Sequence, residues 1–155
     1  MRTISAATAS ALENDNFNLA TLIQFEFSTN IRLTDWDRNL TALSNTWVSS
    51  ANVLSFGSSS ESSDLAVNGI AITLSGVDQT YVAIFLTNNY IDVPVKLYRA
   101  VLNSADVVIG DPILVFDGLI TGFAIEDTED SSEISITTAS HWADFEKLNG
   151  RKTNH

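Results

Sequence analysis

Two aspartates that flank a tryptophan have a spacing that could do chemistry. Asp35 and Asp37 lie two positions apart around Trp36, and residues two apart on a strand share a face. Glycosidases and divalent-cation sites use carboxylates placed in this way. The alternative is that Asp35 caps the loop and Asp37 pairs with Arg38 or Arg32, as is common on acidic surfaces. The alternative is favoured because no catalytic motif accompanies the pair.

A second acidic cluster and the tryptophans offer further candidate sites. The cluster comprises Asp127, Glu129, Asp130 and Glu133. An EF-hand calcium loop needs a glycine in mid-loop and a fixed ligand order, which this stretch lacks, so a solvated turn is the better interpretation. Tryptophans stack on sugar rings in carbohydrate-binding modules, but isolated ones usually anchor cores or interfaces. The three here are Trp36, Trp47 and Trp142.

The composition removes most catalytic options. The chain has no cysteine, which excludes disulfides, thiolate nucleophiles and Cys-ligated zinc. Its two histidines, His141 and His155, both lie near the C-terminus, so a His-rich metal site or a Ser-His-Asp triad has little to work with. No phosphate loop, nucleophile elbow or zinc motif occurs. We therefore expect no enzyme activity, no cofactor and no metal.

The charge of the chain argues against two classes of partner. The 155 residues carry a net charge of -11, whereas nucleic-acid and anionic-membrane surfaces depend on clustered Lys and Arg. No apolar run approaches the roughly 20 residues that span a bilayer, and the N-terminus lacks a hydrophobic signal core. The expectation is a soluble protein made in the cytoplasm, with no membrane binding.

The strongest structural pattern runs from Ile113 to Thr138. A long segment, apolar on both faces, is followed by an acidic turn and by the alternating apolar residues Ile134 and Ile136. This pattern predicts an antiparallel hairpin whose first strand is covered on both sides. Gly118 and Gly122 are expected on one face, where another backbone or a neighbouring subunit comes close. Valine at either position would impair assembly if that face is an interface, and folding if it is core.

The rest of the chain predicts short strands and a few helices in a single domain over residues 1–155. Strands are expected over 19–27, 31–33, 47–56, 65–74 and 93–102, and a mobile serine-rich loop over 58–63. Helices are expected near the N-terminus, over 79–87 (where 82–86 could form a strand instead) and after Ser140. These elements indicate a mainly β protein, an antiparallel barrel or sandwich, with short helices near both termini.

Three segments resemble motifs of tail hub and tail-tip proteins of long-tailed phages and gene transfer agents. Leu33 to Leu40 resembles the family's F-T-D-H-D-R-D-L signature, with Trp36 in place of histidine. Phe116 to Ile120 is similar to its F-x-G-x-I strand, and Trp142 to Asn154 is similar to the helix and arginine motif that follows. Family members generally continue beyond this point, so the chain is expected to be the N-terminal part of a longer protein.

The resemblance implies a structural role in a virion tail. It implies a ring of copies of the chain, a trimer or hexamer, between the distal tail ring or tail tube and the central fibre or spike. DNA would pass through transiently, along a negatively charged conduit. Synthesis would take place in the cytoplasm of a bacterial host. The residues implied in the motifs and in assembly are Asp35, Trp36, Asp37, Arg38, Phe116, Gly118, Gly122, Trp142, Phe145, Gly150 and Arg151.

Two functions of other classes stay open at this point. A carbohydrate-binding module of a receptor-binding tail protein would use the tryptophans and the serine-rich loop. A hydrolase would use Asp35 and Asp37.

Overall fold

The computed structural model describes residues 5–13, 17–49, 53–56, 69–75, 79–127 and 132–140. Over these residues the chain forms two helices and a nine-stranded sheet. In chain order the elements are α1 (Ala6–Glu13), β1 (Asn18–Phe25), β2 (Ile31–Thr34), β3 (Leu40–Ala42), β4 (Asn45–Ser49), β5 (Val53–Phe56), β6 (Ala71–Ser75), α2 (Gln79–Thr87), β7 (Pro94–Leu102), β8 (Ile113–Asp127) and β9 (Ser132–Ser140).

The strands form one open, mixed sheet in the order β3-β4-β2-β1-β7-β8-β9-β6-β5. All neighbours are antiparallel except β2 and β4, which run parallel. The expectation of a mainly β protein is confirmed, but the described strands do not close into a barrel. Closure requires the two end strands to pair, and here β3 and β5 end the sheet.

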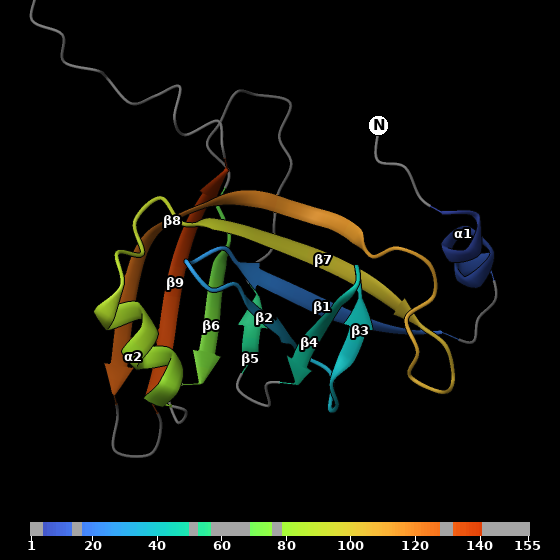
Figure 1. Cartoon of the computed structure of the whole chain (residues 1–155), viewed down its shortest axis with the longest axis horizontal. Coiled ribbons are helices and arrows are strands. Elements are labelled where there is room, and N and C mark those ends of the chain that lie inside the picture. Colours follow the sequence, from blue (N-terminus) through green and yellow to red (C-terminus); the bar gives the residue numbers. More distant parts are fainter. Residues whose placement is uncertain are drawn as a thin grey trace, which may run out of the picture.

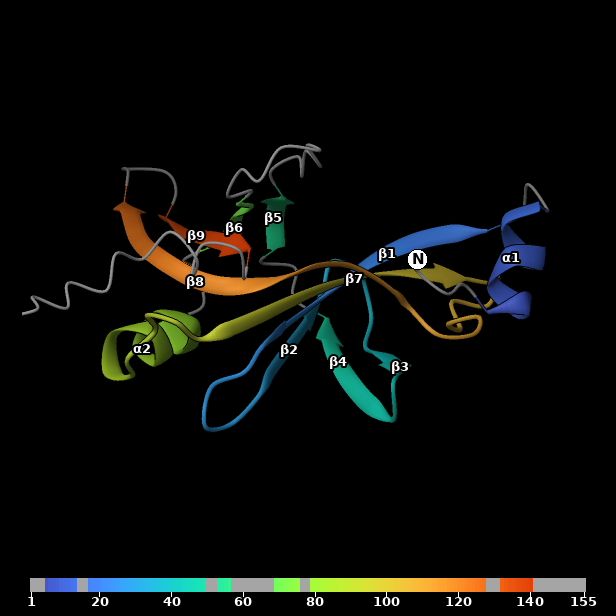
Figure 2. The same cartoon turned by 90° about the horizontal axis from the view of Figure 1, so that it is seen from above.

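The sheet is strongly bent, and the two helices lie at opposite ends of the molecule's long axis (Figure 1). Figure 2 shows β3 and β4 turned to one side of β7, with β5 and β6 turned to the other. A packed core lies on each face of the central strands. Neither described helix is long and apolar enough to cross a membrane.

The larger core lies beneath α2. Phe85 of α2 is 1% exposed and stacks on Phe123, with ring centroids 5.0 Å apart. It also meets Phe25 and Phe27 edge to face. The helix that 79–87 predicted is confirmed over the same residues. As a helix in a separate layer, the segment places Phe85 against the face of the sheet.

The smaller core lies on the opposite face of β1, under the β3–β4 hairpin. Trp47 is fully buried there, and its indole Nε1 donates a hydrogen bond to the carbonyl oxygen of Ala42 at 3.0 Å. Its ring meets Tyr98 edge to face at 5.7 Å. Leu22 belongs to this core, whereas its neighbour Ile23 belongs to the larger one. Since adjacent strand residues point to opposite faces, β1 is covered on both sides.

The predicted hairpin of Ile113 to Thr138 is confirmed as β8 and β9, but the expected position of its glycines is wrong. Ile120 pairs with Thr138 and Gly122 with Thr137, so Thr121 is an extra residue in β8. Such a bulge reverses the side-chain alternation. Gly118 therefore shares a face with Ile120, while Gly122 lies on the opposite face. The bulge also brings Phe123 onto the core side, although its parity in the sequence differs from that of Ile120.

The first helix is fastened to the loop before β8. Ser5 Oγ accepts a hydrogen bond from the backbone N–H of Thr8 at 3.1 Å, as an N-cap does. The buried Thr8 hydroxyl donates to the carbonyl oxygen of Ile109 at 3.2 Å. Gly110 follows with φ of 64°, and a Cβ there would collide with Ser5. The N-terminal helix is thus confirmed, whereas the helix expected after Ser140 lies outside the described residues.

Gly118 and Gly122 form a matched pair for a stability test. A Cβ on Gly118 would meet the carbonyl oxygen of Ala139 and, at 2.6 Å, Phe116 Cζ, whereas a Cβ on Gly122 would lie 3.5 Å from Thr137 Cβ, an ordinary contact. We expect Gly118→Ala to lower the free energy of unfolding by about 1 to 3 kcal/mol, as overpacking does. We expect Gly122→Ala to change it by less than about 0.5 kcal/mol. Urea unfolding measures both, and equal losses would contradict the expectation.

Candidate functional site

The loop between β2 and β3 carries the two aspartates that the sequence singles out. Asp35 turns back onto β1: its Oδ1 accepts a hydrogen bond from the backbone N–H of Thr21 at 2.6 Å. Its own N–H donates to the carbonyl oxygen of Thr21 at 3.2 Å. Asp35 and Thr21 of β1 are therefore joined by two hydrogen bonds, in one of which Asp35 accepts and in the other of which it donates. The Asp35 carboxylate extends the backbone pairing of the sheet past the end of β2.

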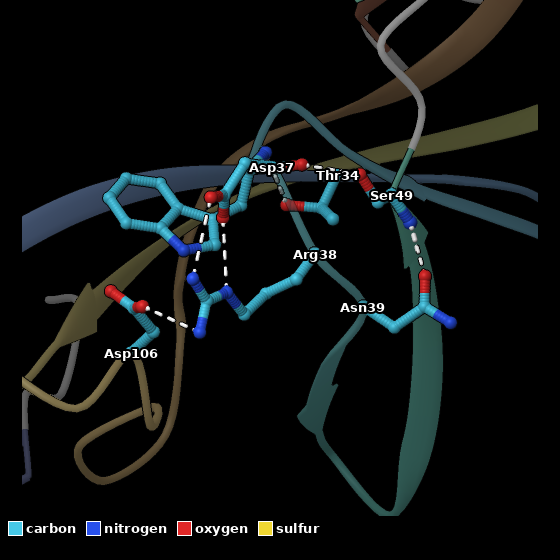
Figure 3. Close-up of polar contacts among 7 residues, drawn as sticks. Thr34, Asp37, Arg38, Asn39, Ser49 and Asp106 are labelled. Atoms are coloured by element: carbon cyan, nitrogen blue, oxygen red, sulfur yellow. Dashed lines mark hydrogen bonds and ion pairs between the residues drawn. The ribbon is translucent and has the colours of Figure 1, made fainter.

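Asp37 forms an ion pair with Arg38 and does not bind the backbone of β1. Its Oδ1 lies 3.2 Å from Arg38 Nε, and Arg38 Nη1 lies 3.2 Å from Asp106 Oδ2 (Figure 3). The hydrogen bond to Asp37, followed by the charges of both carboxylates, raises the pKa of Arg38 above its ordinary value. The guanidinium thereby bridges the β2–β3 loop to the loop between β7 and β8. The expected pairing of Asp37 with Arg38 is confirmed.

The main chain of the loop is tied to β4 as well. Trp36 N–H donates to Thr34 Oγ1 at 3.2 Å, and the carbonyl oxygen of Trp36 accepts from Ser49 Oγ at 2.7 Å. Asn39 Oδ1 accepts from the backbone N–H of Ser49 at 2.8 Å (Figure 3). The half-buried Trp36 ring packs against the smaller core. The loop is thus held from β1, from β4 and from the β7–β8 loop.

This arrangement leaves no shared pair of carboxylates. Asp35 is engaged with the backbone of β1, and Asp37 with a cation, so the two do not converge on a common ligand position. Within the described residues, no group of three or more His, Cys, Asp or Glu side chains could hold a metal ion. The geometry of the loop is that of a structural clamp.

The other predicted site residues divide between core and undescribed segments. Phe116 is 9% exposed and belongs to the larger core, and Gly118 is buried beside it. Trp47, a candidate for sugar stacking, is fully buried. Glu133 lies directly opposite Glu126 across the hairpin. Residues outside the described part of the chain are Trp142, Phe145, Gly150, Arg151, Glu129, Asp130 and the serine-rich stretch 58–63.

A polar row that the sequence analysis missed crosses four strands. Arg32, Gln24, Lys96 and Asp117 lie directly opposite one another on β2, β1, β7 and β8. Arg32 Nε donates to Gln24 Oε1 at 2.9 Å, and Lys96 Nζ lies 2.7 Å from Glu26 Oε1. Each of these residues alternates with apolar neighbours in its own strand, so only the register of the sheet reveals that they form a row.

The Lys96–Glu26 pair shifts the titration of both groups. The hydrogen bond from Lys96 lowers the pKa of Glu26 below its ordinary value of 4.5, against the opposing effect of burial. The same bond raises the pKa of Lys96 above 10.5. Burial raises the pKa of the neighbouring Tyr98. Both charges of the pair therefore persist over a wider pH range in the folded chain than in the unfolded one.

The fold is shared with a protein chain of a solved virion particle. A protein chain from a virion of a native gene transfer agent particle superposes with a TM-score of 0.66 at 12% sequence identity, covering 97% of this chain and 48% of its own length. At this identity the match shows a shared fold.

The particular relative is a hub protein. Baseplate hub protein pb3 of Escherichia phage T5 is 27% identical over 161 residues, which cover 91% of this chain and 17% of pb3. No family model matches the chain. This chain thus spans less than half the length of both proteins. The two comparisons confirm the resemblance to tail hub and tail-tip proteins of phages and gene transfer agents.

Removing each aspartate separately tests whether the loop is a clamp. Asp35→Ala deprives the backbone N–H of Thr21 of its acceptor, so we expect it to lower the free energy of unfolding by about 1 to 2 kcal/mol. Asp37→Ala removes an exposed ion pair and should leave the free energy of unfolding close to the wild-type value. Urea unfolding, followed by tryptophan fluorescence, gives both values. A larger loss for Asp37→Ala than for Asp35→Ala would contradict this account.

The Lys96–Glu26 pair predicts a pH dependence of stability. The pKa of folded Glu26 is depressed below the unfolded value of 4.5. The contribution of Glu26 to the free energy of unfolding is therefore present above pH 4.5 and is lost as the pH falls through the folded pKa. Lys96→Met should therefore lose less stability than the wild type between about pH 5 and pH 3, by up to about 1 kcal/mol. Arg99→Met is the control, since Arg99 donates to the Thr21 hydroxyl. The prediction would be refuted if Lys96→Met and the wild type lost the same free energy of unfolding on acidification.

Proposed function

We propose that residues 1–155 are a hub domain of a phage or phage-like tail tip, part of a longer structural virion protein. The similarity to baseplate hub protein pb3 over 91% of this chain carries the proposal. The shared fold with a gene transfer agent virion protein supports it independently of sequence identity. In this role the domain acts by shape and contact, as a component of a ring that links the tail tube or distal tail ring to the central fibre or spike.

The charge distribution supports passage of DNA through such a ring. The net charge is -11, and two of the described cations are already neutralised, Arg38 by Asp37 and Asp106 and Lys96 by Glu26. A surface with paired cations and excess carboxylates repels phosphate. A DNA conduit lined by this domain would let the polymer slide without binding it.

A structural role also agrees with how the chain uses its motif. Asp35 and Arg38 hold the β2–β3 loop against the sheet, and Trp36 packs on the smaller core. We infer that the motif serves assembly by giving this loop a fixed shape, and that the domain is not an enzyme. Its partners are other copies of the chain and neighbouring tail proteins, and its location is the virion tail, after synthesis in the bacterial cytoplasm.

Light scattering of the purified chain tests the proposal. We expect a mass that is a multiple of 16.8 kDa, either for the chain alone or on addition of the tail-tube or distal tail protein of the same virion. Association with the partner should persist at about 0.5 M salt if apolar contacts dominate, because charge contacts are screened there. A chain that stays monomeric with and without these partners at all concentrations would overturn the proposal.

A further inference from the structure

The polar row that crosses β2, β1, β7 and β8 lies on the same face of the sheet as the smaller core. Gln24 follows Ile23 in β1, and both neighbours of Gln24 belong to the larger core on the other face. The β3–β4 hairpin covers the face of the row only in part, because β4 pairs with β2 at Leu33 and Thr34 and stops short of Arg32. The row, whose members are all half-buried, therefore begins where the cover of the smaller core ends.

Hydrogen bonds hold the side chains of this surface in one arrangement. Arg32 Nε donates to Gln24 Oε1, and Gln24 Nε2 donates to Glu26 Oε1, both at 2.9 Å. The same Glu26 oxygen accepts from Lys96 Nζ at 2.7 Å. A ligand would not have to order these side chains, which removes part of the entropic cost of binding. Within the part of the chain that the structure describes, no hydrogen bond engages Arg32 Nη1, Arg32 Nη2 or Glu26 Oε2, so these atoms are available to a ligand.

An aromatic ring borders the row. Tyr98 lies two residues from Lys96 on β7, on the same face of the strand, and its ring meets Trp47 edge to face at 5.7 Å. Leu114 pairs with Tyr98 on β8 and is 37% exposed. Burial raises the pKa of Tyr98, so its hydroxyl stays a neutral hydrogen-bond donor. A ring with an exposed apolar neighbour thus lies directly beside a row of fixed polar groups.

The charges of this surface balance, unlike those of the whole chain. Arg32 and Lys96 are offset by Glu26 and Asp117, whereas the chain carries -11. An anion would meet the two carboxylates, and a cation would meet the two basic groups. A neutral ligand rich in hydroxyl groups meets neither repulsion, because a hydroxyl donates to a carboxylate and accepts from a cation. The row extends over about 14 Å, from the usual spacing of neighbouring strands, a length that suits an oligosaccharide better than a single sugar.

We propose that the polar row, together with Glu26 and Tyr98, binds a neutral oligosaccharide. Hydroxyl groups of the sugar chain form hydrogen bonds with the fixed polar atoms of the row, and the C–H face of one sugar ring packs on Tyr98. A sugar whose hydroxyls do not match the row is rejected, because it covers a charged group without pairing it. The site is separate from the clamped β2–β3 loop, and the inference does not rest on the proposed hub function.

A glycan array that carries neutral and anionic oligosaccharides tests the proposal on the purified chain. We expect the chain to bind at least one neutral oligosaccharide, and isothermal titration with that oligosaccharide then gives its Kd in solution. Binding of anionic members alone, or of no member of the array, would overturn the proposal.

Two arginines on opposite faces of the sheet form a matched pair for locating the site. Arg32 belongs to the row, whereas Arg99 shares the face of Leu97 and donates to the Thr21 hydroxyl at 3.0 Å. We expect Arg32→Met to raise the Kd by about tenfold or more, because a charge-assisted hydrogen bond is lost. We expect Arg99→Met to leave the Kd unchanged. Equal values of Kd for the two variants would overturn the assignment of the site.

Tyr98→Phe tests the site with little risk to the fold. The substitution keeps the ring against Trp47 and removes only the hydroxyl, so we expect the variant to unfold at the same urea concentration as the wild type. Its Kd should rise by about threefold or more, as expected for the loss of a neutral hydrogen bond. A wild-type Kd in this folded variant would contradict the assignment even if Arg32→Met were unstable.

Discussion

The burial of β1 on both faces is the constraint on which the rest of the structure depends. Ile23 and Phe25 enter the larger core, and Ala20 and Leu22 enter the smaller one. Full burial of one large apolar side chain contributes roughly 1.5 to 3 kcal/mol, so both faces of this strand must be covered for the sheet to be stable. One cover is α2 with Phe85, and the other is the β3–β4 hairpin with Trp47. Among the described residues, Leu43 and Val48 of the hairpin and Leu86 of α2 are exposed.

Two β-bulges interrupt the regular pairing of β8 with its neighbours. Leu97 pairs with Phe116 and Tyr98 with Leu114, so Val115 is an extra residue in the pairing of β8 with β7. Thr121 is likewise an extra residue in the pairing of β8 with β9. Each bulge resets the alternation and increases the local twist. A regular strand of this length would send Phe116 and Phe123 to opposite faces, whereas here both contact the larger core. The bulge at Thr121 therefore brings Phe123 onto the face where it stacks on Phe85.

Local patterns predicted much of the fold. The alternation in 93–102 and in Ile134 and Ile136 predicted strands that exist as β7 and β9. The apolar segment 79–87, followed by two asparagines as a stop, predicted α2. The bulge at Thr121 was missed, because an apolar run on both faces looks the same with or without an inserted residue. That omission also led to the wrong placement of Gly122. The open sheet was not distinguishable from a barrel, since closure depends on which end strands meet and not on their composition.

The candidate site shows the same division between local and distant information. The adjacency of Asp37 and Arg38 predicted their ion pair, but nothing in the sequence links Arg38 to Asp106 or Asp35 to Thr21. Those contacts arise because β1, β2 and β7 bring distant loops to one end of the smaller core.

The departure at Trp36 from the histidine of the resembling motif has a physical explanation in this geometry. The hydrogen bonds made at position 36 use its backbone N–H and carbonyl oxygen, which bind Thr34 and Ser49. The indole Nε1 of Trp36 is buried and makes no hydrogen bond, so the side chain contributes by packing its ring against the smaller core. Asp35 is different, because the hydrogen bond from the N–H of Thr21 requires a carboxylate oxygen on a short side chain. A glutamate would overshoot the N–H, and an alanine would leave it unpaired. The described contacts of Asp35 and Trp36 thus hold the loop in place within the fold.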